Sequence, residues 1–123
     1  MGHKVVVYYP DARGHTPALE FLLGLPQHDQ QKAFAYISYL EEHGEALRRP
    51  IAEYLGNKLY ELRPKQVRIL YAFVGKGTAV ILHTFRKKTG PVPPAEQRLA
   101  QARLADFLQR YEQGSITLRG RGT

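Results

Sequence analysis

The stretch LYELRPKQVRILYAFVGKGTAVILHTF, residues 59–85, decides the fold. It contains three runs rich in β-branched and aromatic residues, which cover residues 59–63, 67–74 and 78–85. Pro64 lies between the first and second runs, and Gly75 and Gly77 lie between the second and third runs. Short runs of this kind bounded by turn residues are typical of adjacent strands. The stretch therefore predicts a three-stranded antiparallel meander.

Outside the meander, the apolar pattern predicts one further strand and three helices. A valine- and tyrosine-rich strand over residues 4–9 precedes a helix that Thr16 caps, and Pro26 separates that helix from a second one that ends at Gly44. The prolines after the meander lead into a last helix, which Gly114 ends. The predicted order is β-α-α-β-β-β-α, an α+β fold whose helices cover one face of an antiparallel sheet.

The chain is long enough for a single hydrophobic core. Its 123 residues include no cysteine, which excludes a disulfide scaffold, a cysteine-ligated metal site and a thiol nucleophile. We expect one domain over residues 1–113 and a tail over residues 114–123 that either frays or adds a strand to a sheet edge. The apolar run near Met1 is too short for a signal sequence or a membrane span, so we expect a cytoplasmic protein without a membrane partner.

The positive charge of the protein is concentrated in one part of the sequence. Residues 58–90 carry eight basic side chains and one acidic side chain, Glu61, a net +7 that equals the formal charge of the whole chain. Tyrosines and phenylalanines alternate with these cations, as in proteins that bind phosphates. An acidic protein partner or an ordinary solvated surface would also account for the pattern.

Strand alternation predicts where the charged side chains lie. If helices bury only one face of the sheet, a mostly basic set of polar side chains gathers on the open face and forms a concave cationic surface. This set is Glu61, Arg63, Arg68, His83 and Lys87.

Four motifs resemble those of a known family. They are GHTPALEFL at residues 14–22, LYELR at residues 59–63, RILY at residues 68–71 and LHTFRKKT at residues 82–89. They are similar to motifs of the phage-derived, HigB-like branch of the RelE/ParE toxin superfamily, and the resemblance extends over residues 4–112. The RelE-like fold that it implies agrees with the predicted element order.

The resemblance implies the toxin of a type II toxin–antitoxin module. Many such toxins are mRNA interferases, endoribonucleases that cut messenger RNA on the translating ribosome, and a small helix-turn-helix antitoxin usually neutralises them. We therefore expect the ribosome, mRNA and such an antitoxin as partners. Two alternatives remain open: a ParE-like inhibitor of DNA gyrase without nuclease chemistry, and a non-toxic antitoxin-binding module.

The same resemblance assigns roles to individual basic residues. Arg68 matches the strand arginine that grips the scissile phosphate, Lys87 matches a basic residue after the last strand, and Arg63 and Lys88 match flanking phosphate contacts. We expect Arg68→Ala to abolish toxicity while the protein stays folded. The wider set expected to contact RNA comprises Lys58, Lys65, Arg86 and Tyr71, although core packing is an alternative for Tyr71.

Metal-free RNA cleavage also needs groups that transfer protons. His83 is one candidate, because imidazole changes charge near neutral pH, and no histidine follows it in the chain. Lys87 is another, and Glu61 either acts as a base or orients Arg63 or Arg68. The spacing of the histidines indicates no metal site, and we expect no cofactor.

Overall fold

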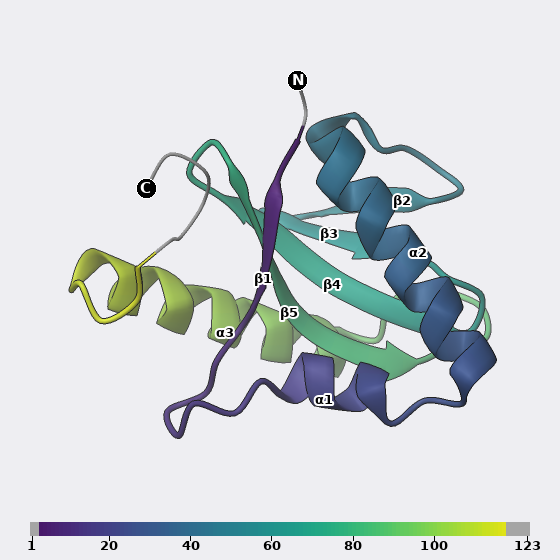
Figure 1. Cartoon of the computed structure of the whole chain (residues 1–123), viewed down its shortest axis with the longest axis horizontal. Coiled ribbons are helices and arrows are strands. Elements are labelled where there is room, and N and C mark those ends of the chain that lie inside the picture. The colour runs from purple at the N-terminus through teal and green to yellow at the C-terminus, as the bar shows by residue number, and fades with distance from the viewer. Residues whose placement is uncertain (1–2, 118–123) are drawn as a thin grey trace.

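The computed structural model describes residues 3–117 and contains one sheet, three α-helices and a short 3-10 helix (Figure 1). The elements in chain order are β1 (Val5–Tyr8), α1 (Pro17–Leu23), α2 (Gln27–His43), the 3-10 helix (Gly44–Ala46), β2 (Ala52–Gly56), β3 (Leu59–Leu62), β4 (Val67–Val74), β5 (Thr78–Arg86) and α3 (Pro94–Glu112). The predicted α+β class is confirmed. None of the helices in this part of the chain is long and apolar enough to cross a membrane.

The five strands form a mixed sheet in the order β1-β5-β4-β3-β2. Strands β2 to β5 pair in antiparallel fashion, which confirms the meander, whereas β1 pairs with β5 in parallel, with Val5 opposite Thr78. The sequence pattern missed β2. This edge strand joins β3 through a turn in which Asn57 and Lys58 both have positive φ, as type I′ hairpin turns require.

Helices cover both faces of the sheet, so the expectation of a single covered face is wrong in this respect. One core packs α1 and α2 against residues such as Ile69 and Ile81, and a second packs α3 against Leu70 and Val80. Strands β4 and β5 are apolar on both faces and therefore need a cover on each. The last helix, α3, covers the second face of the sheet instead of packing beside α1 and α2 on the first face.

A β-bulge in β5 changes which side chains face α3. Leu70 pairs with His83, but the next residue, Tyr71, pairs with Ile81, so Leu82 is the extra residue. Leu82 lies in the core beneath α3, and His83 contacts Glu96 of the same helix. Strict alternation would place Leu82 and His83 on opposite faces of the sheet, so it fails at this point.

The ends of the helices follow the predicted proline and glycine positions. Thr16 stands at the N-cap of α1, although its side chain makes no capping hydrogen bond, and Gly44 ends α2 with a φ of 53°. After α3, the backbone N–H groups of Ser115 and Ile116 both donate to the Arg110 carbonyl. The remainder of the predicted tail, residues 118–123, lies outside the described residues.

Candidate functional site

Most of the basic side chains of residues 58–90 lie at one end of the sheet, where β3 and β5 finish and β4 begins. We call this set the basic end; it consists of Arg63, Lys65, Arg68, Arg86, Lys87 and Lys88. Lys58 and Lys76 lie in the turns at the opposite end of the sheet. Lys58 therefore does not join the phosphate-binding set that the sequence predicted.

Arg68 and Glu61 form a buried ion pair beneath the basic end. Each residue is only 3% exposed, and Arg68 Nε lies 3.3 Å from Glu61 Oε2. Burial raises the pKa of Glu61, against the lowering effects of Arg63 and Arg68, and burial also lowers the pKa of Arg68. The predicted open face does not exist at these two residues, and the burial of Arg68 does not fit its predicted direct grip on a phosphate.

Arg68 instead connects two basic segments through their main chain. Its Nη1 donates to the carbonyls of Lys65, at 2.6 Å, and Val67, at 3.0 Å, while Nη2 donates to the carbonyl of Lys88, at 3.4 Å. The backbone N–H of Lys87 adds a bond of 2.8 Å to the Gln66 carbonyl. The exposed side chains of Lys65 and Lys88 thus project from backbone that the buried guanidinium holds in place.

Arg63 belongs to a second ion-pair network at the edge of the sheet. Its Nη1 lies 3.0 Å from Glu53 Oε1 and 3.7 Å from Glu61 Oε1, and Arg49 Nη2 lies 2.6 Å from Glu53 Oε2. The hydrogen bond from Arg49, reinforced by the charges of both arginines, lowers the pKa of Glu53. No sequence signal pointed to Glu53, because it lies in β2, the strand that the apolar pattern does not reveal.

His83 is held by a carboxylate on α3. Its Nε2 lies 2.5 Å from Glu96 Oε1, and its ring stacks on Phe85 with centroids 5.2 Å apart. The His83 side chain is 13% exposed and that of Glu96 is 34% exposed, so the pair borders on solvent. Glu96 lies in the first turn of α3, and no sequence signal connected it with β5.

The remaining predicted residues divide between the basic end and the core. Arg86 is exposed and lies 3.6 Å from Asp29, and Lys87 is half-buried. Tyr71 is 1% exposed and stacks on Tyr60, so its assignment to an RNA-contacting surface is wrong. Its place in the core follows from the packing of α2 on this face.

Many of the acidic side chains and three of the histidines among the described residues take part in ion pairs. Among residues 3–117, no three histidine, aspartate or glutamate side chains gather as a metal site would require. The chemistry available in this part of the sheet is that of the exposed cations of the basic end and of one imidazole–carboxylate pair on β5 and α3.

Comparison with known proteins supports the family that the motifs suggested. No curated protein has significant sequence similarity to the chain. The family model described as "Phage derived protein Gp49-like (DUF891)" matches residues 20–105, which is more than half of the chain. The matched range includes α2, all strands except β1, and every residue of the basic end. The chain therefore belongs to the phage-derived Gp49-like family, a RelE/ParE-like family of toxins from toxin–antitoxin systems.

Proposed function

We propose that this protein is the toxin of a type II toxin–antitoxin module, in the HigB-like branch, and that it acts as a ribosome-dependent mRNA endonuclease. The observation that carries the proposal is the rigid support of the basic end. Arg68 fixes the carbonyls of Lys65 and Lys88, so that two cationic segments are held side by side. Cations held in advance at fixed positions stabilise developing negative charge without reorganisation during the reaction.

The proposed reaction needs no group beyond the protein and the RNA. The ribose 2′-oxygen attacks the adjacent phosphorus, the bond from phosphorus to the 5′-oxygen breaks, and a 2′,3′-cyclic phosphate forms. In this proposal the proton leaves the 2′-hydroxyl for His83, whose imidazole Glu96 orients, and Lys87 protonates the leaving 5′-oxygen. Lys65, Arg86 and Lys88 bind the phosphates on either side.

Inducible expression in a bacterial host tests this proposal directly. The wild-type chain is expected to arrest growth and to leave messenger RNA cut within translated frames, and purified protein is expected to cut mRNA only when ribosomes are present. The triple variant Lys65→Ala/Lys87→Ala/Lys88→Ala should abolish both effects. Lys76→Ala is the matched control, because Lys76 is an exposed lysine at the opposite end of the sheet. Arrest with intact transcripts would refute the nuclease.

One observation favours a second candidate, a ParE-like inhibitor of DNA gyrase. The arginine expected to grip the phosphate is buried against Glu61 and does not face solvent, and an inhibitor that only binds its target needs no such grip. Under this alternative, expression arrests growth with unbroken RNA and induces the response to DNA damage. Unimpaired growth after strong expression would instead support a non-toxic module that only binds its antitoxin.

A further inference from the structure

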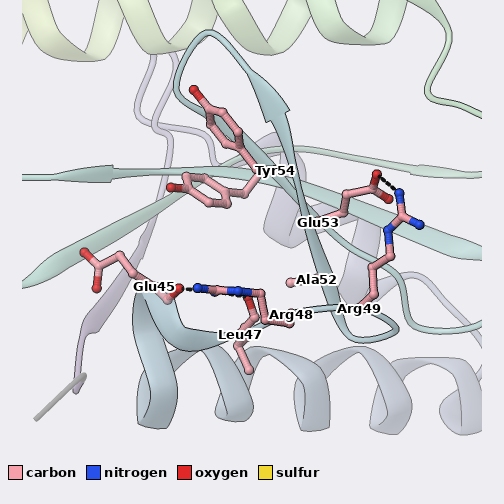
Figure 2. Close-up of a pocket in the computed structure, with 8 residues that line it drawn as sticks. Glu45, Leu47, Arg48, Arg49, Ala52, Glu53 and Tyr54 are labelled. Atoms are coloured by element: carbon pink, nitrogen blue, oxygen red, sulfur yellow. Dashed lines mark hydrogen bonds and ion pairs between the residues drawn. The ribbon is translucent and has the colours of Figure 1, made fainter.

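A groove runs between the end of α2 and the edge of the sheet, away from the His83–Glu96 pair (Figure 2). It encloses about 740 Å³, and its lining residues are Glu45, Leu47, Arg48, Arg49, Ala52, Glu53, Tyr54 and Tyr60. In the close-up, the Tyr54 ring lies on one side of the hollow and the Arg48 side chain on the other. The groove is large enough for a nucleotide, and none of the predicted site residues lines it.

Tyr54 is the exposed end of an aromatic ladder. Its ring lies 4.8 Å from the Tyr60 ring, which in turn stacks on Tyr71 at 5.4 Å and contacts Phe73 edge-on. Tyr71 is buried in the core, whereas Tyr54 is 56% exposed. The inner rings hold the outer ring in place, so that a planar ligand can stack on it with little loss of side-chain entropy.

Arg48 offers a preorganised positive charge across the groove from this ring. Its Nη1 donates to the carbonyls of Glu45, at 2.7 Å, and Leu47, at 3.0 Å, and within residues 3–117 no carboxylate forms an ion pair with it. The carboxylate of Glu45 is already neutralised by Lys4, at 2.9 Å. A guanidinium fixed by main-chain carbonyls but free of a carboxylate is well suited to bind a phosphate.

The groove is continuous with the basic end. A smaller hollow of about 340 Å³ is lined by Arg49, Pro50, Glu53 and Arg63. It shares Arg49 and Glu53 with the groove, and Arg63 belongs to the basic end. A chain of phosphates can therefore pass from Arg48 along the arginines of the sheet edge to Arg63 without crossing an unpaired carboxylate.

We infer that this groove binds an unpaired base of single-stranded RNA, which stacks on Tyr54 while its phosphate contacts Arg48. The inference rests on the proposed function and places a second contact region on the same RNA, away from the scissile bond. An apolar protein segment fits less well, because the lining contains two arginines and only two aliphatic side chains, Leu47 and Ala52. The combination of an exposed ring and a cation is typical of single-strand binding surfaces.

The test compares a normal RNA with one that lacks bases, without ribosomes and without cleavage. The probes are a fluorophore-labelled single strand of about ten nucleotides, which matches the usual span of such surfaces, and an abasic strand of the same length. Tyr54→Leu should weaken binding of the normal strand about 5- to 150-fold and leave binding of the abasic strand unchanged. Tyr54→Phe keeps the ring and should bind as the wild type, even though it loses the hydrogen bond from the Lys58 backbone to the Tyr54 hydroxyl.

Arg48→Ala separates the phosphate contact from the stacking contact. It should weaken binding of both strands and lower the salt dependence of binding, whereas Lys76→Ala should change neither. If the wild type and Tyr54→Leu bound the normal strand with equal affinity, the inference about the groove would be overturned. The proposed function would still stand in that case, provided that the triple variant of the basic end lost its toxicity. If Tyr54→Leu and Arg48→Ala left RNA binding intact but abolished neutralisation by the antitoxin, the groove would be a protein-binding site. A wild-type chain that binds neither strand and does not arrest growth would refute both proposals.

Discussion

Arg68 Nε lies 3.3 Å from Glu61 Oε2, and the two side chains are 4% and 3% exposed. The contact has the distance of an ion pair but not the angle of a hydrogen bond, and Arg68 Nε is the one buried side-chain polar atom among residues 3–117 that lacks a hydrogen bond. Burial opposes the charged form of both partners. The pair therefore depends on mutual compensation. Removal of Arg68 leaves Glu61 buried with only the 3.7 Å contact to Arg63, and removal of Glu61 leaves the buried Arg68 without its carboxylate.

Glu61→Ala should consequently reduce the free energy of unfolding by about 3–5 kcal/mol. The double variant Glu61→Leu/Arg68→Met removes both charges and should be considerably more stable than Glu61→Ala. Urea denaturation followed by circular dichroism measures both. If the double variant lost as much free energy of unfolding as the two single variants together, the compensation between Glu61 and Arg68 would be contradicted.

Arg68→Ala is expected to impair folding, which corrects the expectation that this variant stays folded. It abolishes the bonds to the carbonyls of Lys65 and Lys88 and leaves Glu61 buried without its partner. A loss of toxicity in this variant should therefore coincide with a lower thermal midpoint. A fully stable, non-toxic Arg68→Ala would restore Arg68 as a residue that acts directly on RNA.

Tyr9 and Asp106 should make part of the stability dependent on acid pH. The Tyr9 hydroxyl donates to Asp106 Oδ2 at 2.6 Å, and this bond, with help from Arg110, lowers the pKa of Asp106. A carboxyl whose pKa is lowered by folding stabilises the fold above its unfolded pKa and loses that effect as the pH falls through its native pKa. Tyr9→Phe should thus cost about 1 kcal/mol at neutral pH and progressively less below the ordinary carboxyl range. Thermal melts from pH 7 to pH 3 measure the difference, and a constant difference would contradict the linkage.

The lysines of the basic end should each account for part of the salt dependence of RNA binding. Lys65, Lys87 and Lys88 have no carboxylate within ion-pair distance among the described residues, so each is available to a phosphate. Single alanine variants should reduce the slope of log affinity against log salt by about 1 each. Lys76→Ala should leave the slope unchanged, and equal effects at both ends of the sheet would argue against a localised phosphate surface.

His83→Gln and Glu96→Gln should slow ribosome-dependent cleavage by about 10²–10⁴-fold with little change in RNA affinity. The two residues act as a pair, so the double variant should be scarcely slower than His83→Gln alone. Single-turnover cleavage of ribosome-bound mRNA measures the rate. Wild-type rates in His83→Gln would remove this pair from the proposed chemistry and leave the proton-transfer role to other groups.

Much of the fold could be predicted from the sequence because the signals were local. The meander followed from β-branched runs, and prolines and glycines such as Pro26 and Gly44 marked the helix ends. Strand β2 was not predicted, because Ala52–Gly56 has no clear alternation of apolar and polar residues and is stabilised by its pairing with β3. The position of α3 was mispredicted as well, although the near-continuous apolar runs of β4 and β5 are typical of strands covered on both faces.

The candidate site was predictable in its charge but not in its burial. The sequence localised the excess charge to residues 58–90, but the strand ends decide which cations meet, and they separate Lys58 from Lys65. Whether Arg68 faces solvent depends on which face α3 covers. Glu96 and Glu53 were unpredictable for a related reason: each lies on an element whose place in the fold was not known.

The parallel pairing of β1 with β5 has a consequence for biosynthesis. Val5 leaves the ribosome early, but its partner Thr78 is made only after most of the chain. The first strand must remain unpaired until then, because β5 is its only neighbour in the part of the chain that the structure describes. The backbone that positions Lys87 and Lys88 emerges later still. A nascent chain interrupted before Thr78 lacks both the β1–β5 pairing and the lysines of the basic end, so we expect an incomplete copy to be non-toxic.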